Sequence, residues 1–339
     1  MPTGAPCGGV LGGTVGRMSH TPLPETLPPA FTVSIARAAG VGEGRLRSKD
    51  LRRPFHGVRS RREVFDAGAA DAALSQRDRI RRAALEYAAR MSEFEFFSHT
   101  TAAILWGAAL PLLPDETIHV AILPPRRLPR VRGIRGHEAQ PRLTRVVVHP
   151  GTGLRIASPA TTWAMLGAQP LHPYDLIAAG DSLVRVQRMP GPRPRPMPPP
   201  LARVDQLHAA VRAGRRVGGP LLRETVDRVR TGSASRPESW TRLTLCDAGL
   251  PEPTLDHDVY DDAGNFIGCV DLAYPEWKIA IEYEGDHHRV DPATWNRDME
   301  KHDALQAAGW RVIRVSRTML FAHPGELVAR VAAALRARS

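Results

Sequence analysis

Apolar residues recur along this chain with two different periods. Residues 76–91 carry apolar side chains at helical spacing, and a second helix is expected after Ser98 or Thr100, either of which can act as its N-cap. A third helix is expected where Ser158 precedes a Pro, because Pro is tolerated in the first helical turn. Between them, short apolar runs predict three strands, at residues 118–122, 146–148 and 154–156. Helices and strands in this mixture indicate an α/β region over residues 61–187.

A second α/β region is predicted from residue 203 to residue 339. Helical spacing, with Gly and Pro near the expected ends, predicts helices at residues 203–213, at 220–230, from 237 onward, at 292–308 and at 326–336. Alternating or continuous apolar runs predict strands at residues 266–270, 279–284 and 310–315. The first two of these strands are joined by a Pro-Glu turn and should form an antiparallel hairpin.

The N-terminal part of the chain predicts a small basic module over residues 30–60. A helix, a Gly turn, a second helix with Arg45 and Arg47, and an extended piece follow one another there. This is the element order of a winged helix-turn-helix, and it makes both Arg residues candidate DNA-binding residues. The alternative is a capping subdomain with a solvated basic face. Residues 1–29 are rich in Gly and Pro and are expected to be disordered.

Proline marks the boundary between the two α/β regions. Seven of the twelve residues from Met189 to Pro200 are Pro, which neither a helix nor a sheet can accommodate. We therefore place a semi-rigid linker at residues 188–202. Its basic residues are expected to be exposed: Arg188, Arg193 and Arg195.

Charge and cysteine content narrow the range of functions. A formal net charge of +11 and a pI near 10.5 favour a polyanionic partner, DNA above all, although a GC-rich coding sequence would also enrich Arg. Three widely spaced cysteines fit neither a disulfide framework nor a zinc ligand set and indicate a reducing cytosol. The longest apolar run, residues 101–113, is well short of the roughly 20 residues of a membrane span. We expect a cytoplasmic protein without a membrane partner.

Three carboxylates stand out at the predicted hairpin. Asp271 ends the apolar strand 266–270, and Glu282 and Glu284 share one face of the next strand because side chains alternate between faces. Like charges at one end of a hairpin repel one another unless a cation lies among them. Oxygen ligands of this kind suit Mg²⁺ or Mn²⁺ rather than zinc. The sequence therefore predicts a divalent-cation site with Asp271 and Glu282 as its primary ligands.

The same residues resemble a known motif. Asp271, ten intervening residues and then Glu282-Tyr283-Glu284 resemble the metal site of the PD-(D/E)XK nuclease superfamily, and the last hundred or so residues resemble its very-short-patch-repair-like endonuclease subgroup. The similar segments are Pro237–Ser239, Ala248–Pro251, Val270–Leu272, Ile281–Gly285, His287–His288, Arg297–Asp298 and Gly309–Val312. The N-terminal half is similar to antitoxins of abortive-infection type IV systems, at His56–Val58, Ser98–Ala102 and Ser158–Trp163.

The nuclease resemblance implies roles for further residues. Glu238, at the start of a helix, corresponds to an additional acid ligand, with stabilisation of the helix N-terminus as the alternative. Glu284 stands where most of the superfamily has Lys, and would be an extra ligand or a water-orienting base. His287 would be a second general base or a phosphate contact, unless it is a surface His in a turn.

Two cations are candidates for the function of that missing Lys. Arg297 and Lys301 lie four residues apart on one predicted helix, so they share a face and could hold a phosphate. Ser98 and His99 raise the separate possibility of a nucleophile–base pair. We expect instead an N-cap beside a structural His, with the two side chains pointing apart.

Together these features predict a Mg²⁺-dependent DNA endonuclease or nickase that hydrolyses phosphodiester bonds. The expected fold is α/β, with a winged-helix-like module, an α/β middle region and a restriction-endonuclease-like C-terminal domain. A non-catalytic DNA-binding regulator on a degenerate nuclease fold is the alternative. A sugar hydrolase is disfavoured because aromatic residues make up only 6% of the chain. The choice between DNA and RNA and the oligomeric state are left open.

Overall fold

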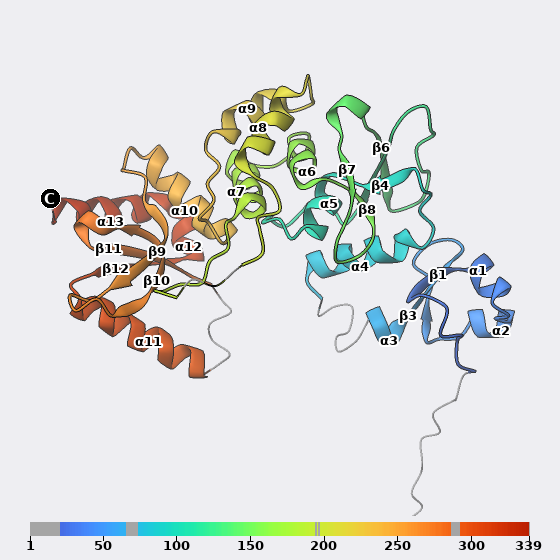
Figure 1. Cartoon of the computed structure of the whole chain (residues 1–339), viewed down its shortest axis with the longest axis horizontal. Coiled ribbons are helices and arrows are strands. Elements are labelled where there is room, and N and C mark those ends of the chain that lie inside the picture. The colour runs from blue at the N-terminus through green and yellow to red at the C-terminus, as the bar shows by residue number, and fades with distance from the viewer. Residues whose placement is uncertain (1–20, 66–73, 194, 196, 286–291, 339) are drawn as a thin grey trace, which may run out of the picture. The chain divides into compact units, whose positions relative to one another are not determined.

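The computed structural model describes residues 21–65, 74–193, 195, 197–285 and 292–338, with the side chains of Phe65 and of 292–298 excepted (Figure 1). Contacts divide the chain into two compact units, Met1–Ala70 with Leu85–Arg90 and Asp71–Ala84 with Met91–Ser339. Helices and mixed sheets both occur, so the prediction of an α/β fold is confirmed. Within the described ranges no helix is long and apolar enough to cross a membrane.

The first unit is built on a three-stranded antiparallel sheet of order β1-β3-β2. Its elements are β1 (Ala30–Thr32), α1 (Val33–Ala38), α2 (Glu43–Leu46), β2 (Leu51–Arg52), β3 (Val58–Arg61) and α3 (Arg62–Phe65). Thr32 caps α1 by accepting a hydrogen bond from the backbone N–H of Ile35, as its sequence position suggests. The basic helix, α2, is only four residues long. The extended piece starts at Val58, because the residues before it form a turn.

The second unit begins with a five-stranded mixed sheet of order β6-β5-β4-β8-β7. The strands are β4 (Glu95–Phe97), β5 (Ile118–Ile122), β6 (Ile134–Glu138), β7 (Val146–Val148) and β8 (Arg155–Ala157). The helices are α4 (Gln76–Ala88), which spans both units, α5 (His99–Leu105), α6 (Pro159–Leu166) and α7 (Pro173–Val184), with a 3₁₀ turn at Pro141–Leu143. Every residue of β5 is buried, which explains why all of its residues except His119 are apolar.

A second sheet, of order β12-β11-β10-β9, forms the C-terminal part of this unit. β9 (Thr254–Tyr260), β10 (Phe266–Tyr274) and β11 (Ile279–Glu284) are antiparallel neighbours, and β12 (Arg311–Ser316) runs parallel to β11. The helices are α8 (Val204–Arg212), α9 (Gly219–Val226), α10 (Arg236–Asp247), α11 (Pro292–Ala307), α12 (Arg317–Phe321) and α13 (Pro324–Arg336), and a 3₁₀ turn, Pro275–Trp277, joins β10 to β11.

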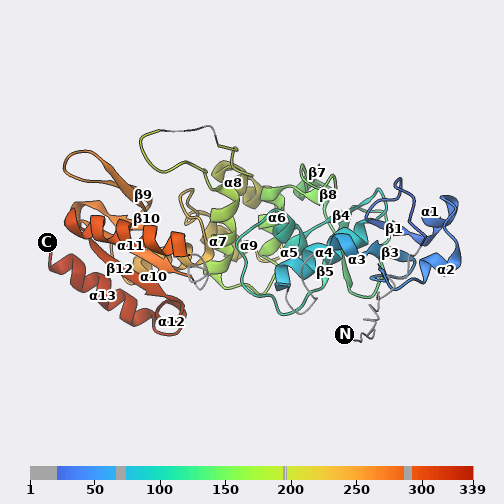
Figure 2. The ribbon, with the colours of Figure 1, turned by 90° about the horizontal axis from the view of Figure 1, so that it is seen from below.

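Helices cover both faces of this sheet. Figure 1 shows α10 and α13 on one side of the strands and α11 on the other, and α11 lies in front of the strands in Figure 2. Side chains from α10, α12 and α13 pack on a layer that includes Leu272 and Ile281. Leu305 of α11 packs with Ala273 and Ala280, which alternate with that layer. The alternation of the strands therefore assigns these four side chains to two different cores.

The expectation for the Pro-rich segment is half right. Its described residues from Met189 to Pro200 form neither helix nor strand. Arg188 is not simply exposed, however, because its guanidinium donates to the carboxylates of Asp256 and Asp258, each at 2.8 Å. These acids of β9 hold the start of this segment against the sheet.

Candidate functional site

Strand register brings Asp271 and Glu282 to the same place. Leu272 pairs with Ile281 across β10 and β11, and extending this register by one residue places Asp271 opposite Glu282. Both side chains lie on the face of the sheet that α11 covers, because they alternate with Leu272 and Ile281 of the other face. The Asp271 carboxylate is fixed by the backbone N–H of Tyr283, which donates to its Oδ2 at 2.9 Å. The hairpin thus orients the acid as the sequence pattern predicts.

Glu238 reaches the same region from the first turn of α10. The Ser235 hydroxyl caps this helix by accepting from the Glu238 N–H, and Glu238 Oε2 accepts from the Ala234 N–H at 2.7 Å. The side chain is only 8% exposed. Its role in the helix N-terminus, the alternative reading from the sequence, is therefore observed. It does not exclude a second role, because the carboxylate also lies in the electric field of Asp271.

The protonation of these acids is strongly perturbed. Burial, with the negative charge of Asp271, raises the pKa of Glu238 to about 7. Burial also raises the pKa of Asp271, with the charge of Glu282 adding to the shift and the Tyr283 N–H and Lys301 opposing it. Within the described chain, the carboxylate oxygens of these three acids do not all lie within 4.8 Å of one another. Another group of three possible metal ligands in the protein has that spacing. They form a group of electrostatically interacting acids that a bound cation would draw together.

Lys301 brings a positive charge to this group from α11, which covers the other face of the sheet from α10. Its ammonium forms an ion pair with Glu282, and both side chains are about three-quarters buried. The aliphatic part of Lys301 crosses β10 over Gly268, where an added Cβ would lie 3.1 Å from the Lys301 side chain. Gly268 therefore makes room for the Lys301 side chain, a requirement that sequence spacing alone does not reveal.

The other predicted site residues are placed differently. Glu284 is half-exposed and pairs with Arg314 of the neighbouring strand at 3.0 Å, so its charge is compensated within the sheet. His287 lies outside the described residues, as does the side chain of Arg297.

In the first unit, Arg45 is engaged by Asp50 through two hydrogen bonds, of 3.0 and 2.7 Å, whereas Arg47 is exposed. The structure thus does not bring Arg45 to the surface as a free phosphate ligand.

A group of three His side chains was not foreseen. His99 starts α5, His119 lies in β5 and His137 in β6, and one ring nitrogen from each lies within 4.8 Å of the other two. The expectation for Ser98 and His99 was wrong in one respect, since their side chains do not point apart: Ser98 Oγ is 3.0 Å from His99 Nδ1. Ser98 is the N-cap residue by position but makes no side-chain cap hydrogen bond.

Burial governs the ionisation of all three imidazoles. It lowers the pKa of His99 to about 2 and that of His119 to about 4. His137 and Arg135 add smaller effects in the same direction at both residues, and Asp115 opposes them at His119. The pKa of His137 is lowered by burial and by the charge of Arg135. The group is therefore neutral at physiological pH, the state in which imidazoles bind metals.

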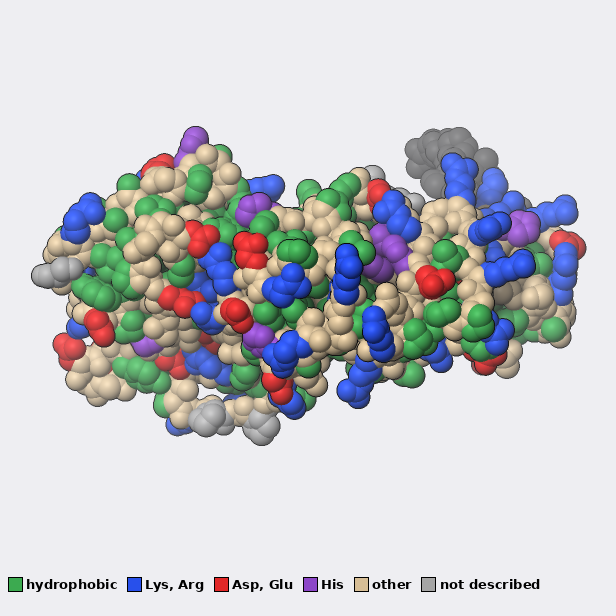
Figure 3. Space-filling model, turned by 90° about the horizontal axis from the view of Figure 1, so that it is seen from above, with side chains coloured by type: hydrophobic (Ala, Val, Ile, Leu, Met, Phe, Trp, Pro, Cys, Tyr) green, Lys and Arg blue, Asp and Glu red, His purple; other side chains and the backbone are tan. Residues whose placement is uncertain are grey.

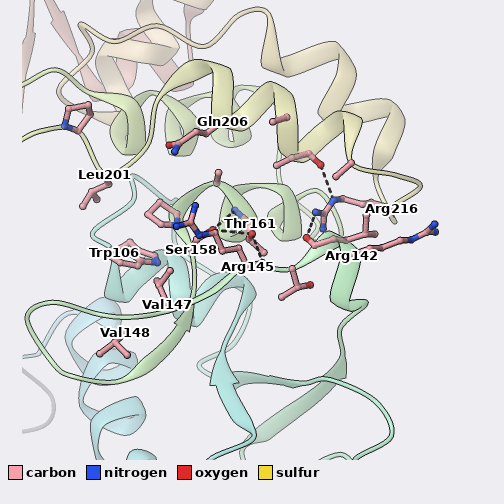
Figure 4. Close-up of a pocket in the computed structure, with 18 of the residues that line it drawn as sticks. Trp106, Arg142, Arg145, Val147, Val148, Ser158, Thr161, Leu201, Gln206 and Arg216 are labelled. Carbon is pink, nitrogen blue, oxygen red and sulfur yellow. Dashed lines mark hydrogen bonds between the residues drawn. The ribbon is translucent and has the colours of Figure 1, made fainter.

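A groove of about 760 Å³ lies elsewhere in the second unit (Figure 4). Apolar side chains such as Trp106, Val147 and Leu201 line it, with the exposed Arg142 and Arg145 at its border. Arg216 also lines it, but donates to the backbone carbonyls of Ala210 and Leu143. None of Glu238, Asp271 and Glu282 lines this groove.

Fold and site together define an α/β protein with a buried carboxylate group on its C-terminal sheet. The chain belongs to the family of two uncharacterized proteins of Mycobacterium tuberculosis, MT2308 of strain CDC 1551 and Rv2248 of strain H37Rv. Each is 30% identical over 235 residues, which cover 68% of this chain and 78% of the relative. No protein-family model matches the chain.

A structural comparison adds one weak similarity. The crystal structure of the RV2827C protein from Mycobacterium tuberculosis aligns with 69% of this chain and 84% of its own, at 17% identity and a TM-score of 0.36. This similarity is too low to support a conclusion about fold or function.

Proposed function

We propose that this protein is a divalent-cation-dependent DNA endonuclease or nickase that hydrolyses phosphodiester bonds. The observation that carries the proposal is the group formed by Asp271, Glu238 and Glu282, with Lys301 reaching it from α11. Buried, mutually repelling acids with a single Lys among them are typical of sites that handle a cation and a phosphate. A purely structural cluster would gain stability from having fewer of these acids.

The ligand chemistry fits Mg²⁺ or Mn²⁺. All three candidate ligands are carboxylates, and burial together with like charge raises the pKa of two of them, which a bound cation would reverse. When bound, such an ion polarises a phosphodiester and makes a water molecule more acidic. Asp271 and Glu282 would hold it, and Glu238 would complete the site from the start of α10.

Lys301 supports a catalytic reading of the site. The resembled nucleases carry Lys where this chain has Glu284, and here a Lys arrives at the equivalent acid from a helix instead. The chain has 46 Lys and Arg residues, but only Lys49, Lys278 and Lys301 are Lys. An ammonium can give up a proton or orient water, whereas a guanidinium stays protonated. We assign Lys301 the contact with the phosphate or the attacking water.

The first test compares two acid variants of the C-terminal sheet. Purified protein is incubated with supercoiled plasmid and with single-stranded DNA, in Mg²⁺, Mn²⁺ or EDTA. We expect wild type to nick or cut DNA with a metal, and Asp271→Asn to lower the rate by about 10²-fold or more, a typical loss for a group acting directly in the reaction. The matched control is Glu276→Gln, which removes an exposed acid of the adjoining turn and should retain wild-type activity.

A second pair of variants tests the assignment of Lys301. Lys301→Met should lower cleavage by roughly 10²-fold with DNA binding retained, and Lys278→Met, which removes the same charge beyond the far end of β11, should not. Equal activity of Lys301→Met and Lys278→Met would remove Lys301 from the site. If wild type cuts neither DNA with any divalent ion yet binds DNA, the catalytic proposal fails and a DNA-binding regulator replaces it.

A further inference from the structure

Three imidazoles from three separate elements meet in the middle sheet of the second unit. We propose that His99, His119 and His137 form a second metal site, which takes a transition-metal cation, Zn²⁺ foremost. This goes beyond the proposed nuclease chemistry and does not depend on it, because a different ligand set is used. Imidazole nitrogen suits Zn²⁺, Co²⁺ or Ni²⁺, whereas the carboxylate group suits Mg²⁺.

The spacing of the nitrogen atoms is near that of a zinc site. His137 Nε2 lies 3.0 Å from His119 Nδ1, and the ligand atoms of all three residues lie within 4.8 Å of one another. Zn–N bonds of about 2.0–2.1 Å in a tetrahedral site place the nitrogens about 3.3–3.4 Å apart. Small side-chain rotations therefore convert the observed group into a ligand set. Three protein ligands leave the fourth position open to a small molecule such as water.

The backbone holds these side chains in place. The Ser98 N–H donates to the His119 carbonyl at 3.1 Å, and the His119 N–H donates to Thr101 Oγ1 at 2.8 Å, so the start of α5 is tied to β5. His137 follows on β6, which runs parallel to β5 with His137 paired to Ala121. A ligand set built on a helix start and two adjacent strands is rigid, as a metal site requires.

Two features of His99 point to a role beyond packing. Its φ of +49° lies in the left-handed region, a strained conformation for a residue with a side chain, of a kind that is concentrated at functional sites. Its Nδ1 is 3.0 Å from Ser98 Oγ, a hydrogen bond that fixes the ring and presents Nε2 as the ligand atom. Most metal-binding His residues make a hydrogen bond of this kind through the ring nitrogen that does not bind the metal.

Without a metal, the hydrogen-bonding nitrogens of the three imidazoles are only partly satisfied. The rings of His99 and His137 stack with centroids 3.9 Å apart, and a single proton is shared between His119 Nδ1 and His137 Nε2. Arg135, whose charge acts on all three imidazoles, pairs with Asp115 at 3.7 Å, which reduces its repulsion of a metal ion. His137, the most exposed of the three, provides a path for entry and can tilt out of the stack on binding.

The test titrates metal into protein freed of metal by a chelator. Co²⁺ binding is followed by its visible absorption and Zn²⁺ affinity by calorimetry, both with Mg²⁺ in excess so that the carboxylate group is occupied. We expect one equivalent to bind to wild type and to Asp271→Asn alike. His137→Asn should weaken Zn²⁺ binding by at least 10²-fold, since it removes a ligand, and His137→Cys should retain it, because a thiolate also binds zinc.

His149→Asn is the matched control. His149 is a half-buried His in the same part of the chain, packed on Trp106 at a ring distance of 4.6 Å and outside the group of three. Its variant should bind Zn²⁺ as wild type does. Circular dichroism of each metal-free variant checks that the fold is intact. Failure of wild type to bind Zn²⁺ or Co²⁺, equal binding by His137→Asn, or loss of binding in Asp271→Asn would each overturn the proposal.

Discussion

Burial decides the charge of Glu238, the most strongly perturbed acid of the candidate active site. With a pKa of about 7, Glu238 is partly protonated at neutral pH, and in that form it accepts the Ala234 hydrogen bond without a charge that would repel Asp271. A cation reverses this preference, because it stabilises the ionised form. Glu238 therefore couples the occupancy of the site to proton release, and the pH dependence of stability reports on this coupling.

We predict that Glu238 makes the metal-free protein less stable as pH rises. Its pKa is raised from an ordinary 4.5 to about 7, so between these values the unfolded chain loses the proton while the folded protein keeps it. By linkage, stability falls through this window, by up to about 3 kcal/mol, and is constant below and above it. Urea unfolding from pH 4 to pH 8 in EDTA measures the effect as the difference between wild type and Glu238→Gln.

The difference matters because other groups oppose this trend. The lowered pKa values of His99 and His119 make stability rise with pH below about 6.5, in wild type and variant alike. Glu276→Gln, which removes an exposed acid, should track wild type at every pH. If wild type and Glu238→Gln show parallel curves, Glu238 does not titrate as its burial indicates.

Individual elements show which features of this protein its sequence reveals. The hairpin of β10 and β11 was predictable, because alternation assigns Glu282 to one face and a Pro-Glu turn separates the two strands. The expected strand end at Asp271 was wrong, since β10 continues to Tyr274 and pairs with β11 there. Strands β4 and β6 were not, since β6 is polar and contains Gly136, and its existence depends on parallel pairing with β5. The His group was missed for a related reason. Its members lie about twenty residues apart, and only strand order brings them together.

The contact of Lys301 with Glu282 also could not be predicted from the sequence. Sequence spacing placed Lys301 on a helix with Arg297, and only the packing of α11 over Gly268 directs it to an acid of β11. The contact between the Pro-rich segment and β9 could not be predicted from the sequence either. A Pro-rich composition predicts the absence of regular structure but not which sheet the segment contacts. Arg188 makes this connection testable.

We predict that Arg188 stabilises the hairpin of β9 and β10. Besides Asp256 and Asp258, it contacts Cys269 Sγ at 3.2 Å, so it bridges both strands. Arg188→Met leaves two half-buried carboxylates without their cation and should lower the free energy of unfolding by roughly 1–3 kcal/mol. Arg193→Met, an exposed site in the same segment, should have little effect in the same urea titration. Equal stability of the two variants would mean that the contact is only incidental.

Charge is distributed unevenly over the molecule as a whole. From Pro251 to Asp286 the sequence has ten acidic residues and one Lys, a net charge of −9 inside a chain whose total is +11. Lys and Arg side chains are spread over the face in Figure 3 rather than gathered at one point. On the proposed function, DNA would be held by such a surface through its phosphates, and the acidic segment would repel it unless a cation were present. Binding and cleavage should therefore respond to different ions.

We accordingly predict steeply salt-dependent and weakly sequence-selective DNA binding. Each phosphate contact releases counterions and contributes about −0.9 to the slope of log affinity against log salt for duplex DNA. Fluorescence anisotropy of a short duplex, in EDTA and between about 50 and 200 mM salt, measures this slope.

The exposed Arg142 and Arg145 at the border of the groove are the sites to change. Replacing both with Gln should make the slope shallower by about 2, whereas replacing both with Lys should preserve it. A flat salt dependence of wild type would contradict phosphate-based binding, and an unchanged slope in the Gln variant would place the DNA elsewhere on the molecule.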